Sequence, residues 1–163
     1  MTCKCRDVCD IRFVKTHEDA QLPKRNHENM ILASIGTPIY GTHDSGYDIF
    51  CCEDKLVPAR QAVEVETGIK VGYITPGFWF RIEARSGLGF KHKLCPHFGV
   101  IDNAYRGRTS VLIYNNSDID YIFKKGDRIA QLVIYPLIES TIGWTEEAGS
   151  THRGEKNLGS SGK

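Results

Sequence analysis

The ten residues GVIDNAYRGR, numbers 99–108, combine a strand end, a chain reversal and several reactive side chains. The first apolar pair has the character of a buried strand end, and Asn103-Ala104 is a two-residue reversal of the kind that joins antiparallel strands. Gly99 and Gly107 bracket the reversal and predict places where the backbone comes close to another group. The stretch therefore predicts a β-hairpin.

Three side chains near the tip of this hairpin have functional chemistry. The carboxylate of Asp102 can hold a water molecule or a sugar hydroxyl, and Tyr105 offers a flat apolar face. The guanidinium of Arg106 can pair with an acid or a phosphate. A structural interpretation is also open at this point, with Asp102 as a turn cap and Tyr105 as a core residue.

The flanking sequence predicts an all-β fold. Short apolar or alternating runs recur between turn signals, whereas no long amphipathic helix is found, and at most one short helical turn follows Ser86. This pattern is typical of a β-barrel or sandwich. The predicted strands cover residues 11–15, 47–52, 62–71, 78–84, 109–114, 121–124 and 129–135.

Length and charge restrict the function classes. The 163 residues suit one domain with an ordinary core. Lys and Arg number 21 against 20 Asp and Glu, so no global field recruits nucleic acid or a membrane. No apolar run has the length of a signal peptide or membrane span, which predicts an intracellular protein, cytoplasmic or nuclear, of host or viral origin. The six cysteines match no zinc spacing and are expected to be reduced thiols.

Two Gly-rich segments predict anion binding. Arg85-Ser86-Gly87 follows a predicted strand, and successive backbone N–H groups in such a turn form an anion-binding concavity. The tail repeats this composition from Arg153 to Gly162. Asp48 lies inside an apolar strand and must be either a hydrogen-bonded strut or part of a site. Together these features predict a phosphorylated ligand with a divalent metal, Mg²⁺ being favoured because it binds largely through phosphate oxygens.

The chain resembles the trimeric dUTPase family over about residues 34–162. Five family motifs occur in order, and their joint register is far more specific than any one of them. The matching segments are residues 46–49 (GYDI), 85–88 (RSGL), 99–107 (GVIDNAYRG), 126–131 (GDRIAQ) and 153–162.

The resemblance implies a jelly-roll-like β domain that forms a homotrimer with active sites at the subunit interfaces. It implies hydrolysis of dUTP to dUMP and pyrophosphate with Mg²⁺, which keeps uracil out of DNA and supplies dUMP for thymidylate synthesis. The implied division is an N-terminal extension over residues 1–33, partly disordered, a β domain over 34–148 and a flexible arm over 149–163. The extension offers a place for a protein partner.

The resemblance also assigns site residues. Asp102 would hold the attacking water and the sugar 3′-hydroxyl, and Tyr105 would pack under the deoxyribose. Asp48 would support the metal indirectly, through water, while Asp127 and Arg128 would be structural. Uracil would be recognised by the backbone of Phe98, Gly99, Val100 and Ile101. The phosphates would be bound by Arg85, Ser86, Gly87 and Gln131, and the arm would contribute Arg153, Leu158, Gly159, Ser160 and Ser161.

The sequence departs from the family pattern near the base and in the arm. Leu158 replaces a phenylalanine that would stack on uracil, a contact of about 1–3 kcal/mol by analogy with base–aromatic stacking. Asn157 replaces a glycine, Ser161 a threonine, and Phe98 stands where a small residue is usual. These departures predict a rearranged pocket or a poorer enzyme.

Two alternatives to an active dUTPase come from different classes. A dCTP deaminase has a related fold, but that family places a glutamate at the position of Asp102. A dUTPase-like interaction or signalling module would have lost its catalysis. The retained polar residues of all five motifs argue against such a module, and the unusual residues 1–33 argue mildly for an added partner.

Overall fold

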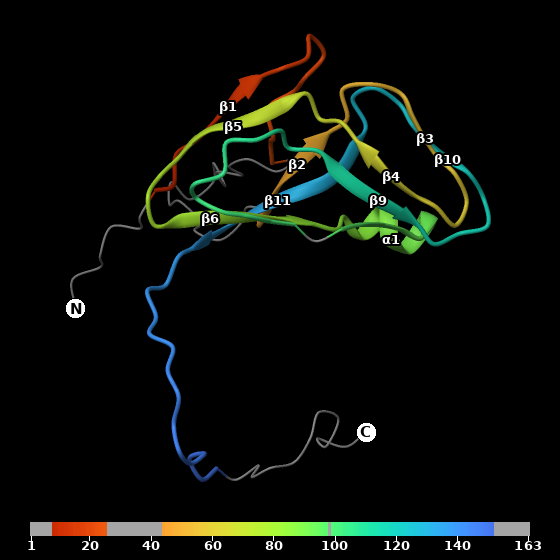
Figure 1. Ribbon diagram of the computed structural model, residues 1–163. Helices are drawn as coiled ribbons and strands as arrows, with labels where there is room; N and C mark the ends of the chain where they lie inside the picture. The colour runs from red at the N-terminus through yellow and green to blue at the C-terminus, as the bar shows by residue number, and fades with distance from the viewer. Residues whose placement is uncertain (1–7, 26–43, 98, 152–163) are drawn as a thin grey trace, which may run out of the picture.

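The computed structural model describes residues 8–25, 44–97 and 99–151, and within these ranges the chain is mostly β (Figure 1). Eleven strands and one short helix, α1 (Ser86–His92), are formed there. The all-β prediction is confirmed. The strands are β1 (Ile11–Lys15), β2 (Gly46–Phe50), β3 (Lys55–Val57), β4 (Ala62–Val65), β5 (Ile69–Ile74), β6 (Phe78–Glu83), β7 (Leu94–Pro96), β8 (Gly99–Ile101), β9 (Val111–Asn115), β10 (Tyr121–Phe123) and β11 (Arg128–Pro136).

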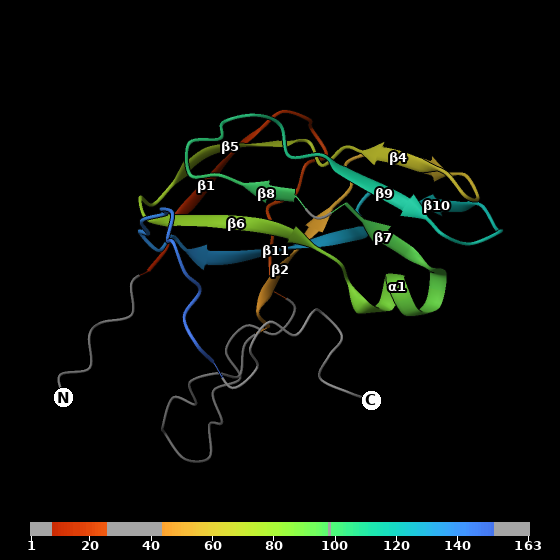
Figure 2. The same cartoon turned by 60° about the horizontal axis from the view of Figure 1, so that its bottom comes forward.

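The strands pair into four small antiparallel sheets around one core. The largest has the order β2-β11-β6-β8, and the others are β4-β9-β7, β1-β5 and β10-β3. Figure 2 shows β6 and β11 running side by side through the middle of the molecule. β6 and β11 pack against the other sheets in one hydrophobic core. Its buried side chains include Phe80, Ile82, Val111, Ile113, Phe123 and Leu132.

Strand periodicity places the polar residues of the largest sheet on the face opposite the core. In β6 the side chains of Phe80 and Ile82 are buried, so Glu83 lies on the other face. Gln131 of β11 is paired with Glu83 on one side and with Asp48 of β2 on the other. One polar row therefore crosses three strands of this sheet.

Part of the predicted N-terminal extension belongs to the β domain. β1 pairs along its length with β5, and the ring of Phe13 makes an edge contact with Phe80 at 6.4 Å between centroids. Lys24 forms an isolated bridge with Asp48 at the edge of β2. The boundary expected at residue 33 therefore does not mark the start of the fold. A partner-binding role for residues 1–33 stays a prediction.

Three short elements differ from the sequence-based expectation. β3 and β7 have three residues each, too few for a periodic signal, and β7 contains Pro96, which an edge strand of the β4-β9-β7 sheet tolerates. The single turn expected after Ser86 is instead the seven-residue helix α1. Leu88 is the only buried residue of α1, so the helix has no amphipathic stripe by which the sequence could predict it. The helix ends at Lys93, which has the left-handed conformation.

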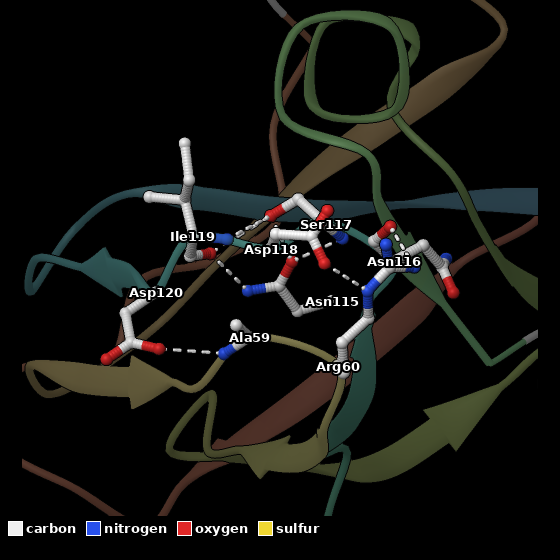
Figure 3. A network of polar contacts seen from close by, with 8 residues as sticks. All are labelled: Ala59, Arg60, Asn115, Asn116, Ser117, Asp118, Ile119 and Asp120. Carbon is white, nitrogen blue, oxygen red and sulfur yellow. Dashed lines mark hydrogen bonds and ion pairs between the residues drawn. The ribbon is translucent and has the colours of Figure 1, made fainter.

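A buried amide fixes the loops at the end of β9 (Figure 3). Asn115 is 2% exposed, and its side-chain nitrogen donates to the carbonyls of Val57 and Ile119 at 3.0 and 2.9 Å. Its oxygen accepts from the backbone N–H and the hydroxyl of Ser117. Nearby, Arg60 forms an ion pair with Asp118 at 2.8 Å. These bonds join the loop after β3 to the loop before β10.

The cysteines within the described ranges are free thiols, as predicted. Cys51 and Cys52 are buried, and burial raises the pKa of both thiols. Cys51 also donates to the carbonyl of Lys124 at 2.9 Å. The two buried thiols therefore remain protonated and act as core residues.

Candidate functional site

A polar cavity of about 400 Å³ gathers residues that are far apart in the sequence. β2, the start of α1 and β11 supply its walls. Five predicted site residues meet there: Asp48, Arg85, Ser86, Gly87 and Gln131. The cavity, called the cradle below, is completed by Asp44, Ser45 and Gly46.

One carboxylate organises the cations of the cradle. Asp48 is 7% exposed, and its Oδ1 accepts from Nε of Arg85 at 2.9 Å. Its Oδ2 accepts from Nη1 of Arg128 at 3.3 Å, and Nη1 of Arg85 donates to the carbonyl of Arg128 at 3.0 Å. Asp44 also lines the cavity, so the charges of Asp44, Asp48, Arg85 and Arg128 sum to zero. The capacity of the cradle to bind an anion therefore rests on the Arg85 guanidinium and the N–H and O–H donors around it.

Replacing Asp48 by asparagine should destabilise the fold. An amide cannot accept from both guanidiniums as a carboxylate does, and a buried pair that loses one partner costs about 3–5 kcal/mol. Arg128 is partly exposed, so we expect a decrease of about 2–3 kcal/mol in the free energy of unfolding, measured by urea denaturation. The exposed Asp54, paired with Lys124, provides the control Asp54→Asn. Equal stability of the two variants would contradict the anchoring role of Asp48.

Gln131 reaches the cradle because its neighbour is a glycine. Its Nε2 donates to the carbonyl of Ala84 at 2.8 Å, directly before Arg85. A Cβ atom on Gly46 would lie 2.3 Å from Oε1 of Gln131, so only glycine leaves room for this side chain. Gly46 was predicted only as the first residue of the GYDI motif, and no site role was predicted for Asp44 or Ser45. Their place in the cavity follows from the pairing of β2 with β11, which the sequence does not reveal.

The stretch 99–108 forms a tight turn but no hairpin. The N–H of Tyr105 donates to the carbonyl of Asp102 at 3.0 Å, which confirms the reversal at Asn103-Ala104. β8, however, pairs with β6, and the chain after the turn crosses to β5, where the N–H of Val71 donates to the carbonyl of Gly107. The predicted hairpin is therefore wrong, since the returning segment finds its partner in another sheet.

The side chains of this turn are held mainly by its own backbone. The hydroxyl of Tyr105 donates to the carbonyl of Arg108 at 2.7 Å, and Gly107 is required because a Cβ there would lie 2.3 Å from that hydroxyl. Nη1 of Arg106 donates to the carbonyls of Asn103 and Tyr105 at 2.6 and 2.7 Å. The guanidinium of Arg106 thus donates to carbonyls within the turn. The close approach expected at Gly99 is not found.

Asp102 lies at the opposite end of β6 from the cradle. It is exposed and lines a second, mainly apolar cavity of about 640 Å³ with Trp79 and Val100. Ile101 pairs with Phe80, so Asp102 is level with the start of β6, whereas Arg85 follows the end of that strand. Six residues of strand span about 20 Å. Within one chain, Asp102 therefore lies too far from the cradle to contact a ligand bound by Arg85 directly.

The dUTPase family model matches residues 35–162, most of the chain. The chain belongs to the dUTPase family. One relative is the deoxyuridine 5′-triphosphate nucleotidohydrolase of Paramecium bursaria Chlorella virus 1, which is 40% identical over 133 residues, 81% of this chain and 94% of the relative.

Solved dUTPases share the fold. A mutant dUTPase of Staphylococcus bacteriophage 80alpha, determined with dUpNHpp, is 27% identical and covers 94% of this chain and 99% of its own, with a TM-score of 0.78. A mutant dUTPase of phage phi11 of S. aureus coordinates a structural Mg(II) ion. It is 25% identical, with a TM-score of 0.70, and the match covers 86% of this chain and 99% of its own.

The residues assigned to uracil recognition by the dUTPase resemblance are described in part. Gly99 and Ile101 are half-buried in β8, and Val100 is exposed. Within the described ranges no helix has the length and apolar character needed to cross a membrane. The assigned site residues that lie outside the described ranges are Phe98, Arg153, Leu158, Gly159, Ser160 and Ser161.

Proposed function

We propose that the chain is a dUTP diphosphatase, which hydrolyses dUTP to dUMP and pyrophosphate. The observation that carries this proposal is the cradle, in which Arg85 is fixed by Asp48 beside Ser86, Gly87 and Gln131. The relatives carry the name of this activity, and the chain retains the residues that the activity needs. Its product would supply thymidylate synthesis, and its removal of substrate would keep uracil out of DNA.

The site residues have two proposed roles, the stabilisation of charge and the activation of water. The triphosphate carries about four negative charges, and the Arg85 guanidinium with the other donors of the cradle stabilises the charge that develops on the leaving pyrophosphate. Asp102 is exposed, so its carboxylate is free to orient a water molecule and accept its proton. Positioning and electrostatics then lower the barrier without a covalent intermediate.

The separation of Asp102 from the cradle supports a site shared between subunits of a homotrimer. One chain supplies Asp102 and Tyr105, a second supplies the cradle, and residues 149–163 supply Arg153, Leu158, Gly159, Ser160 and Ser161. The segment after β11 leaves the β body in both views (Figures 1 and 2) and exposes Leu137, Ile138, Ile142 and Trp144. Exposed apolar side chains of this size are typical of a subunit interface.

Magnesium fits as an ion that enters with the nucleotide. The described residues contain no group of three or more His, Cys, Asp or Glu side chains arranged to hold a metal. Both oxygens of Asp48 accept from guanidiniums, which makes this side chain a better anchor than a ligand. Phosphate oxygens are then the main ligands, and the bound ion would neutralise the leaving pyrophosphate. An indirect contact of Asp48 through water stays a prediction.

The test is pyrophosphate release from dUTP, UTP and the four standard deoxynucleotides, dCTP among them, with Mg²⁺ or with excess chelator. We expect release from dUTP alone and loss of activity with chelator. Ammonia release from dCTP would favour the deaminase alternative. A trimer that binds dUTP without releasing pyrophosphate would favour the interaction module and contradict the proposal.

Tyr105→Ala should weaken the discrimination between dUTP and UTP. The ring is fixed by its bond to Arg108, and we propose that its face lies beneath the deoxyribose, where a 2′-hydroxyl would not fit. Removing the ring costs the deoxy substrate its packing, so the ratio of kcat/KM for dUTP over UTP should fall about tenfold. Tyr114→Ala, at another half-exposed tyrosine, is the control. An unchanged ratio would place the sugar filter elsewhere.

A further inference from the structure

The side chain of Asn103 ties the Asp102 turn to a different part of the fold. Its Nδ2 donates to the carbonyl of Thr75 at 2.9 Å and to the carbonyl of Phe78 at 2.8 Å. An asparagine amide has two N–H donors, so both are used on the turn between β5 and β6. No role was predicted for Asn103 beyond the reversal itself.

The turn that receives these two bonds is itself fixed from both sides. The N–H of Thr75 donates to the carbonyl of Asp10 at 2.9 Å, and the N–H of Asp10 donates to the hydroxyl of Thr75 at 2.8 Å. The N–H of Leu137 donates to the carbonyl of Gly77 at 2.7 Å. Segments before β1 and after β11 therefore hold the turn to which Asn103 is bound.

Asp102 depends on this support because its own side chain has none. Within the described ranges, no hydrogen bond or ion pair reaches the Asp102 carboxylate. Its position is set by the backbone turn that the Tyr105 N–H closes. The bonds from Arg106 act inside the turn, whereas those from Asn103 connect it to the rest of the fold.

We propose that Asn103 is a positioning residue for dUTP hydrolysis, an inference that rests on the proposed function. Its amide holds the turn so that the Asp102 carboxylate and the Tyr105 ring keep a fixed position relative to β6. A misplacement of a catalytic group by about 1 Å costs about 10²-fold in rate. The strand β8 is held by its own pairing with β6, so the base-recognising backbone keeps its place without Asn103.

Loss of the Asn103 amide should lower kcat with little change in KM. Asn103→Ala removes both donors and should lower kcat for dUTP about 10–100-fold. Asn103→Asp has the same shape but presents a carboxylate to two carbonyl oxygens, so its kcat should fall further. The control is Asn116→Ala, at an exposed asparagine in the loop after β9. Amide hydrogen exchange at Tyr105 should become faster in both Asn103 variants and not in the control.

The outcomes separate this inference from the proposed function. If the unaltered chain releases no pyrophosphate from dUTP, the proposed function fails and the role of Asn103 fails with it. If the unaltered chain is active and Asn103→Ala keeps kcat within twofold, only the role of Asn103 is overturned. A lower kcat that follows the folded fraction in thermal unfolding, with unchanged exchange at Tyr105, would also overturn it.

Discussion

Replacing Asp102 by asparagine should lower the kcat for dUTP by a factor of about 10²–10⁴ and leave nucleotide binding largely intact. The amide keeps the size of the side chain and a hydrogen bond to the sugar, but it cannot accept a proton from water. Because Asp102 is exposed at the end of β8, the substitution should not destabilise the fold. Pyrophosphate release gives kcat, and titration with a non-hydrolysable analogue gives the affinity.

A second exposed aspartate provides the control for this experiment. Asp118→Asn removes one carboxylate from the loop before β10, and we expect its kcat to stay within twofold of the parent chain. A kcat of Asp102→Asn within a few-fold of the parent would show that another group activates the water molecule.

Deleting the residues after Gly149 should abolish most hydrolysis while leaving the β domain folded. The deleted residues include Arg153 and the hydroxyls of Ser160 and Ser161, which we propose bind the terminal phosphate. The deletion starts beyond β11, so the sheets lose no strand. We therefore expect unchanged assembly in sedimentation, nearly unchanged dUMP binding and a kcat lower by about 10²-fold or more.

The same deletion can reveal whether the site is shared. In trimers refolded from a mixture of the deletion and Asp102→Asn, some sites receive an intact Asp102 from one chain and an intact arm from another. Such mixtures should regain activity although each parent is nearly inactive. A mixture with demonstrated hetero-trimers and no regained activity would contradict the shared site.

Sequence periodicity predicted the larger strands because their side chains alternate between core and polar faces. The runs at β1, β6 and β9 show this alternation, and all three are strands. β3 and β7 are short and pair with strands that are distant in sequence, and α1 is short with one buried residue. Local pattern therefore carries no signal for them.

Motif residues could be predicted as a set, but their arrangement in space could not. Arg85, Asp48 and Gln131 were predicted to serve one site, and the cradle brings them together. The hairpin expected at Asp102 was wrong because the choice of strand partner is a long-range property. The separation of Asp102 from Arg85 depends on the same pairing of β8 with β6.

The origin of the cradle in β2, α1 and β11 has a consequence for folding. Asp48, Arg85 and Arg128, whose bonds hold it together, are 37 and 43 positions apart along the chain, so a partly folded chain cannot assemble it. A nucleotide that binds the cradle therefore binds the native state alone. By mass action, a ligand at about 100 times its Kd adds about 2.7 kcal/mol to the free energy of unfolding. When substrate is abundant, the enzyme is thus protected from unfolding and proteolysis by the molecule that it destroys.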